Sequence, residues 1–317
     1  MSEKNSWAMV LKIIVSLIAF YAILRLSKLR LEWVSLHLSS VNVYYLCLAF
    51  LVYLLAVIVL GIRWKRAIAI FQEISLKEAI REVYVSLFSS IIVPARMGDF
   101  VKTVLLKRTH KTVKRKSVCS VILEKSCDLF WMLSLSLLAI LFLFFFFKPP
   151  SSLFLQFAVS GAVIFLLMLM LVVFASQNHI AISVLLKMPV VKRHYKIIRN
   201  YLPIAFKQSN FFTVLAITML AWLLGAFRVW LCAQSLGINI SYFYLVLFLP
   251  LIYVISLLPI SAGGLGAVDL VGVFIYSMIG ISSDYAMALM ILDRLTSFLP
   301  SVIIGFILTV STVSQRK

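Results

Sequence analysis

Long apolar stretches separated by short polar loops make up most of the chain. A helix needs about 20 apolar residues to cross the hydrocarbon core of a bilayer. Six stretches of roughly this length give the predicted full spans, which lie at about 7–26, 43–62, 118–147, 153–175, 211–236 and 286–313. The pattern predicts an all-α polytopic membrane protein with about six full spans.

Two further apolar segments are each interrupted by a turn that contains proline and glycine. The first turn reads Pro94-Ala95-Arg96-Met97-Gly98-Asp99, and the second runs from Pro259 to Gly266. Broken helices are expensive at membrane depth, and finding them at corresponding places in two halves of a chain points to a transporter binding site. The predicted turn residues are Pro94, Gly98, Pro259, Gly263, Gly264 and Gly266.

Basic residues predict the orientation of the spans. The chain carries 30 Lys and Arg against 11 Asp and Glu, a net charge of +19, and its mean hydropathy is +1.08. Basic loops of membrane proteins lie in the cytoplasm, so the runs at 63–66, 102–116 and 176–210 and both termini are expected there. Anionic lipid head groups would also attract these residues, whereas nucleic acid is not an expected partner.

The loop charges agree with one topology only if both turns are re-entrant hairpins. The first hairpin then enters from the cytoplasm and the second from outside, and the poorly basic loops at 148–152, 237–241 and 281–285 face out. Lys28 and Arg30 are an exception, because this topology places them outside. Helical rather than barrel spans imply the cell membrane, inner or plasma, as the location.

The same order of motifs occurs in both halves of the chain. A glycine and an arginine precede each hairpin, as Gly61 and Arg63 and then as Gly225 and Arg228. An acid-base pair follows each hairpin at near-equal spacing, as Glu124-Lys125 and Asp293-Arg294. We therefore predict inverted repeats inside a single transmembrane domain that covers 1–317. Its parts are half A at about 43–147, half B at about 211–313, a linker at 148–210 and an extra first span at 7–26.

Ionisable residues around the hairpins form the candidate substrate site, because charge at membrane depth is costly and usually functional. The candidates are Arg96, Asp99, Glu124, Asp128, Asp269, Asp293 and Arg294. If the hairpin tips meet near the midplane, these groups form one polar cluster in which Arg96, Arg294 and helix N-termini hold a lipid phosphate. The alternative is that arginine-acid pairs only lock helices together.

The helical wheel and the helix ends add two expectations about neighbouring basic residues. Glu124 and Asp128 are one turn apart and share a face, so Lys125 is expected to point elsewhere. Arg63 and Arg228 lie near helix ends and are expected to snorkel to the head groups.

Metal, redox and nucleotide chemistry have no support in the sequence. The four cysteines lie in apolar segments without metal-ligand spacing, and the four histidines are scattered in polar loops. We therefore expect no metal site and no cofactor. A phosphate-binding loop of the GxxxxGK[ST] type is also missing, so pumping driven by ATP is not expected of this chain alone.

The two turns resemble those of the lysylphosphatidylglycerol synthase transmembrane region, the flippase-like or YbhN-like family. The resemblance rests on Pro94, Arg96, Gly98 and Asp99, on the later Pro-Gly-Gly-Leu-Gly turn, and on Asp293-Arg294, and it covers about 43–313. Asp99 and Asp269 stand where that family more often has glutamate, and Lys125 where it has arginine. The soluble aminoacyltransferase domain of full-length synthases has no counterpart before Lys317, so lysyl transfer is not expected.

Three functions are compatible with this sequence. The first, which we favour over an enzyme, is a translocase. It would move a charged or lipid-linked head group through the polar cluster, and its substrate would be a phospholipid or a polyprenyl-linked lipid. The second is a membrane-embedded enzyme that modifies lipids or lipid-linked glycans, such as a glycosyltransferase. The third is an accessory subunit that works with a lipid-modifying enzyme.

Overall fold

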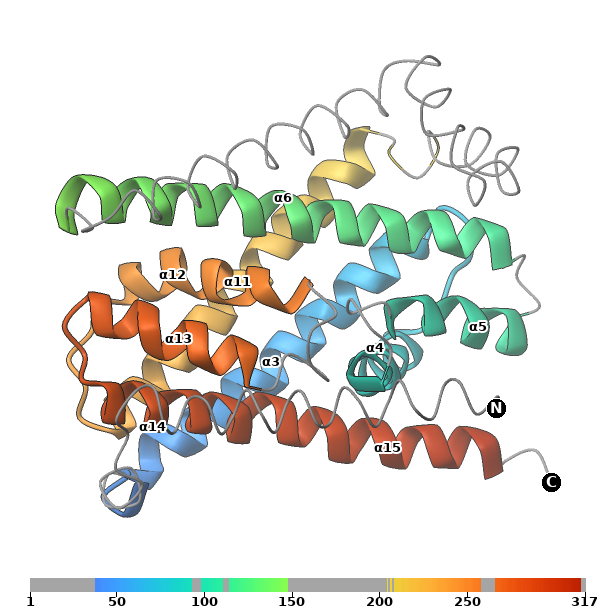
Figure 1. Cartoon of the computed structure of the whole chain (residues 1–317). Coiled ribbons are helices and arrows are strands. Elements are labelled where there is room, and N and C mark those ends of the chain that lie inside the picture. Colours follow the sequence, from blue (N-terminus) through green and yellow to red (C-terminus); the bar gives the residue numbers. More distant parts are fainter. Residues whose placement is uncertain are drawn as a thin grey trace, which may run out of the picture.

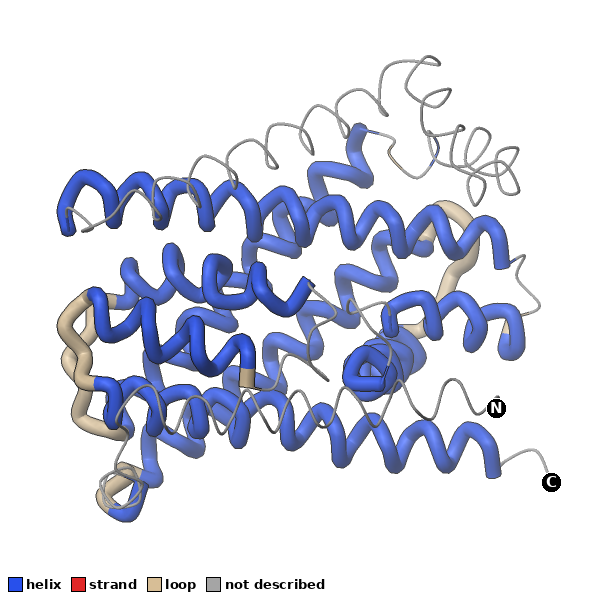
Figure 2. The backbone as a smooth tube through the Cα atoms, viewed as in Figure 1, coloured by secondary structure: helices blue, strands red, loops and turns tan. Residues whose placement is uncertain are grey.

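The computed structural model describes residues 38–92, 98–110, 114–147, 208–257 and 266–314, together with positions 204 and 206. Every regular element in this part of the chain is a helix, as Figure 2 shows. The predicted all-α class is therefore confirmed. The predicted spans at 7–26 and 153–175 lie outside the described residues.

Four helices of the described part are long and apolar enough to cross a membrane. Three are α3 (Val43–Ile68), α6 (Lys114–Phe147) and α11 (Gln208–Ser235). The fourth is a continuous rod of α14 (Ser283–Asp293), the π-helical turn η4 (Arg294–Phe298) and α15 (Leu299–Ser314). Each of the four coincides with a predicted span.

Shorter helices form the arms of the two predicted hairpins. The first hairpin consists of α4 (Leu76–Ile92) and α5 (Phe100–Thr109). The second consists of α12 (Tyr242–Val254), which the 3₁₀ turn η2 (Ile255–Leu257) extends, and α13 (Ala267–Met278). The two arms of each hairpin contact each other. Most of each turn, at 93–97 and 258–265, lies outside the described residues.

Side chains at the helix starts explain where the hairpin arms begin. At α4, the Ser75 backbone N–H donates to Glu78 Oε2 at 3.3 Å, and the Glu78 backbone N–H donates to Ser75 Oγ at 3.2 Å. This reciprocal pair satisfies two amides that a helix start leaves free. At α13, the Gly266 backbone N–H donates to Asp269 Oδ2 at 2.9 Å. Gly266 has a φ of 79°, a backbone conformation that glycine adopts without strain.

The two hairpins lie toward opposite ends of the long helices. Figure 1 shows α12 beside the part of α6 that ends at Phe147 and α5 beside the part that begins at Lys114, while α13 lies between α12 and α14. The loops at 236–241 and 279–282 lie at one end, and the loop at 69–75 lies at the other (Figure 2). This separation of the loops matches the one that the loop charges predict.

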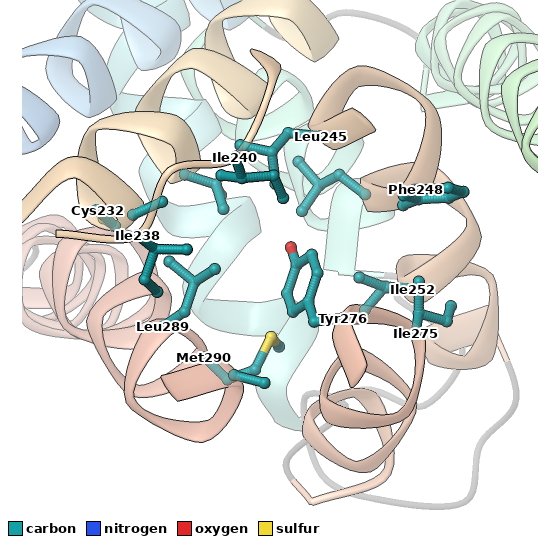
Figure 3. Packing of buried hydrophobic residues seen from close by; sticks show 14 of the residues in the cluster. Cys232, Ile238, Ile240, Leu245, Phe248, Ile252, Ile275, Tyr276, Leu289 and Met290 are labelled. Atoms are coloured by element: carbon teal, nitrogen blue, oxygen red, sulfur yellow. The ribbon is translucent and has the colours of Figure 1, made fainter. Parts of the chain in front are cut away.

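Two groups of buried hydrophobic residues fix the hairpins in place. The first group includes Trp64 of α3 with Val83 of α4 and Leu106 of α5. The second surrounds Phe248 of α12 and Tyr276 of α13, and Figure 3 shows how its side chains enclose the Tyr276 ring. Each hairpin therefore has its own packed core.

Gly98 is packed closely against α4 of the first hairpin. A Cβ atom at this position would lie 2.3 Å from the backbone nitrogen of Ser90 and 2.6 Å from the carbonyl oxygen of Ser86. Gly98→Ala is therefore expected to lower the free energy of unfolding by about 1–3 kcal/mol, because backbone atoms would have to move. Gly225→Ala is the matched control, since its Cβ would meet nothing closer than 4.0 Å. Equal thermal stability of the two variants in detergent would contradict this packing.

Candidate functional site

Six charged residues form a polar group between the first hairpin and two spanning helices. This first cluster consists of Arg63, Asp99, Lys102, Glu124, Lys125 and Asp128. Arg63 of α3 contacts both acids of one α6 face, with Nε 3.0 Å from Glu124 Oε1 and Nη1 2.6 Å from Asp128 Oδ1. The predicted shared face of Glu124 and Asp128 thus binds one guanidinium.

The first hairpin joins this cluster through α5. Lys102 Nζ lies 2.9 Å from Glu124 Oε2 and 2.8 Å from Asp99 Oδ1. Asp99 is also within contact of Lys125, which lies 3.9 Å from Asp128 as well. The expectation that Lys125 points elsewhere is therefore wrong. A helical wheel of α6 alone could not show that Asp99 approaches from another element on the side of Lys125.

A second cluster lies between the second hairpin and two other spanning helices. It consists of Arg228, Tyr253, Asp269, Asp293, Arg294 and Thr296. Arg228 of α11 contacts Asp293 Oδ1 at 2.5 Å, and its Nη1 donates to Thr296 Oγ1 at 2.6 Å. The other oxygen of Asp293 accepts a hydrogen bond from the Tyr253 hydroxyl at 2.8 Å. Both carboxylate oxygens of this buried acid are therefore bonded.

Arg294 faces a different partner from its neighbour Asp293. Its Nε lies 3.0 Å from Asp269 Oδ1, so it ties the last spanning helix to the start of α13. The change from α-helix to π-helix begins at this residue. Such π turns inside α-helices are frequent at functional sites.

Corresponding residues of the two halves make corresponding contacts. Each cluster contains one deeply buried pair, Arg63–Glu124 in half A and Arg228–Asp293 in half B. Each also contains a more exposed ion pair between an acid of the hairpin and a base of a spanning helix, which we call the hairpin pair. Lys125 and Asp99 are 32% and 15% exposed, and Arg294 and Asp269 are 16% and 11% exposed, whereas Glu124 is 1% exposed and Asp293 2%. The pairs therefore occur in the same order along both halves, although the sequence alone did not predict these partners.

The charges within each cluster balance. Three bases meet three acids in the first cluster, and Arg228 and Arg294 meet Asp269 and Asp293 in the second. Burial alone would raise the pKa of the Asp99 carboxyl, but the ammonium groups of Lys102 and Lys125 hold that pKa well below its usual value. Pairing of this kind offsets the desolvation cost of buried charge.

Three further findings differ from the sequence-based expectations. Arg63 and Arg228 do not snorkel: they are 5% and 6% exposed and pair with acids, because crossing helices cover them. Lys102 was not among the candidates, since it begins a basic run that resembles a cytoplasmic loop. The candidate residues form two groups rather than one, and no ion pair between described residues joins them.

Several candidates cannot be placed. Arg96, Pro94, Pro259, Gly263 and Gly264 lie outside the described residues, so their roles stay predictions. Within the described part, no group of three His, Cys, Asp or Glu side chains could hold a metal ion.

The Tyr276 hydroxyl is buried among apolar side chains, without a hydrogen-bond partner in the described part of the chain (Figure 3). An unpaired buried hydroxyl costs about 1–3 kcal/mol. Tyr276→Phe is therefore expected to keep or raise the free energy of unfolding. Tyr253→Phe should lower it by about 1–2 kcal/mol, because Asp293 loses a donor. Thermal unfolding in detergent compares the two variants. If Tyr276→Phe lost more stability than Tyr253→Phe, the Tyr276 hydroxyl would have a hydrogen-bond partner after all.

Comparison with known proteins connects this arrangement with a family. The family described as the lysylphosphatidylglycerol synthase TM region matches residues 9–305. A UPF0104 membrane protein of Pyrococcus horikoshii is 20% identical over 292 residues, which cover 84% of this chain and 87% of that protein. A UPF0104 membrane protein of Methanocaldococcus jannaschii is 25% identical over 224 residues, covering 70% and 93% respectively. These matches and the four spanning helices indicate a multi-pass membrane protein.

Proposed function

Because the chain belongs to the family of the lysylphosphatidylglycerol synthase transmembrane region, we propose that it is an integral membrane lipid translocase. It moves a charged or lipid-linked head group across the bilayer past the two polar clusters, while the lipid tails stay in the hydrocarbon. The observation that carries the proposal is the partly exposed ion pair at each hairpin, Asp99–Lys125 and Asp269–Arg294.

The buried and the exposed pairs have different roles in this proposal. Arg63–Glu124 and Arg228–Asp293 hold the spanning helices together, because their charges are closed off from a ligand. The hairpin pairs offer a cation to a phosphate and a carboxylate to an ammonium group. Charge-assisted hydrogen bonds of this kind are roughly twice as strong as neutral ones. A head group exchanges its water shell for these contacts as it passes.

The apolar surface of the long helices suits the lipid tails. Phe145 and Phe146 near the end of α6 are 70% and 72% exposed, and Phe306 of α15 is 54% exposed. Side chains of this kind on a spanning helix face lipid rather than water. The head group and the tails of one lipid thus find separate polar and apolar surfaces on the same protein.

Inverted repeats complete the proposed mechanism. In this topology both termini are cytoplasmic, the first hairpin opens to the cytoplasm and the second to the outside of the cell membrane. Alternate opening of the two hairpins moves the head group, as in transporters built from inverted repeats. Without a nucleotide-binding loop, the movement follows the lipid gradient or is coupled to ions or potential.

Lipid scrambling in proteoliposomes tests the proposal. Phospholipids with a fluorophore on the acyl chain keep their native head group, and dithionite bleaches those in the outer leaflet. We expect the wild-type protein to expose nearly all of the label, whereas protein-free vesicles expose about the outer half. Arg96→Ala and Arg294→Ala are expected to lose this activity. Well-folded wild-type protein that moves none of several head groups would refute the translocase.

A further inference from the structure

Glu82 is a buried acid that the two clusters do not use. It lies on α4 of the first hairpin and is 1% exposed. The Trp64 indole Nε1–H donates a hydrogen bond to its Oε2 at 2.6 Å. Its neighbours Ala79 and Val83 belong to the hydrophobic group that packs α4 against α3. The carboxyl group is therefore buried and accepts a hydrogen bond from an aromatic ring.

No basic group of the described residues lies within ion-pair distance of Glu82. This sets it apart from Glu124, Asp269 and Asp293, each of which contacts a lysine or an arginine. A carboxylate without a partner is costly to bury, and the usual response is to take up a proton. Burial raises the pKa of the Glu82 carboxyl to about 7, against the hydrogen bond from Trp64, which lowers it.

The charged groups that face Glu82 come from two helices. Glu78 and Arg81 lie on α4 itself, and Lys102 reaches over from α5. The Lys102 ammonium sits 4.9 Å from the centre of the Trp64 ring and contacts Asp99 and Glu124 of the first cluster. From α3 the indole of Trp64 is the facing group, and α15, which also packs on α4, has no titratable residue between Leu299 and Ser314.

We propose that Glu82 is a proton-binding site of the first hairpin, which communicates with the first cluster through Trp64 and Lys102. When Glu82 is protonated, it does not attract the Lys102 ammonium, which stays paired with Asp99 and Glu124. Loss of the proton to water creates a carboxylate that attracts Lys102 and weakens its hold on these two acids. The contact between the hairpin and α6 is then looser at high pH than at low pH. Proton binding at Glu82 does not depend on lipid movement.

Infrared difference spectroscopy tests the site without a transport assay. The reconstituted protein is perfused with buffers of stepped pH, and the C=O stretch of protonated carboxylic acids is recorded. We expect a band that disappears with a midpoint at about pH 7. Glu82→Gln should remove this band, and Glu73→Gln, at an exposed position, should keep it. A titrating band that survives in Glu82→Gln, or none in the wild type, would overturn the proposal.

Two further variants keep the test decisive if Glu82→Gln does not fold. Trp64→Phe removes the donor to the carboxylate, so the midpoint should rise. Lys102→Gln removes the facing cation and should raise it too. An unchanged midpoint in Lys102→Gln would overturn the link to the first cluster. A failed lipid scrambling assay would leave all these spectra unaffected, so the two proposals fail separately.

The same site predicts how stability depends on pH. The folded-state pKa of Glu82 lies above the usual glutamate value of 4.5, so the folded protein holds the proton more tightly than the unfolded chain. Its contribution to stability is present at low pH and is lost as pH rises through about 7. We expect the melting temperature of the wild type to fall over this window relative to Glu82→Gln. Parallel curves for the two proteins would contradict it.

Discussion

Arg228→Leu is expected to lower the free energy of unfolding by about 3–5 kcal/mol, because it leaves the buried Asp293 carboxylate without a cation. Asp293 is 2% exposed, and its other described partner, Tyr253, is neutral. Thr296 would also lose the hydrogen bond that it accepts from the guanidinium. Equilibrium unfolding of the purified protein in detergent measures this loss.

The double variant Arg228→Leu with Asp293→Leu is the control for this result. Replacing both partners of a buried ion pair by apolar residues is often neutral or stabilising, so the double variant should recover most of the stability. A recovery of stability would show that the pair holds the two helices together and that its two charges compensate each other. A double variant that is less stable than Arg228→Leu would contradict this account, since Asp293 would then have another essential partner.

Arg294→Gln is expected to slow lipid scrambling at least tenfold with only a small loss of stability. Arg294 is 16% exposed, and Asp269 keeps its bond to the Gly266 backbone when the guanidinium is removed. Losing one charge-assisted contact of about 1.5–3 kcal/mol to a passing head group corresponds to a tenfold or greater change in rate. The rate at which dithionite bleaches the fluorophore in proteoliposomes measures this change in the scrambling rate.

Two variants control for general effects of lost positive charge. Lys65→Gln removes an exposed basic residue of α3 outside the clusters and should scramble like wild type. Lys125→Gln removes the corresponding cation of α6, which pairs with Asp99 of the first hairpin, and should be impaired like Arg294→Gln. Equal activity of Arg294→Gln and Lys65→Gln would exclude the hairpin pair from the lipid path.

The hairpin arms and spans were predictable because apolar length and proline-glycine turns are local signals. Helix α4 ends at Ile92, just before the first predicted turn, and α13 begins at Ala267, directly after the second. The π turn at Arg294–Phe298 was not predicted, since no residue there breaks a helix by itself. Helix α3 also continues to Ile68, past the predicted end at 62, and this extension carries Arg63 into the protein.

The candidate site was predictable only in part. Acids at membrane depth are rare, so Asp99, Glu124 and Asp293 were recognisable. Their basic partners were not, because the chain contains many lysines and arginines and the sequence does not show which ones crossing helices cover. Arg63 and Arg228 illustrate this, as each pairs with an acid more than 60 positions away in the sequence.

Photocrosslinking from the head group tests most directly whether lipids pass the two clusters. Proteoliposomes would contain a phospholipid with a diazirine in the head group, and mass spectrometry would locate the adducts. We predict adducts around Asp99–Lys125 and Asp269–Arg294, whereas the same lipid with an acyl-chain diazirine should label the exposed Phe145 and Phe146. Head-group adducts confined to the outer apolar surface, with none at either hairpin pair, would contradict the account.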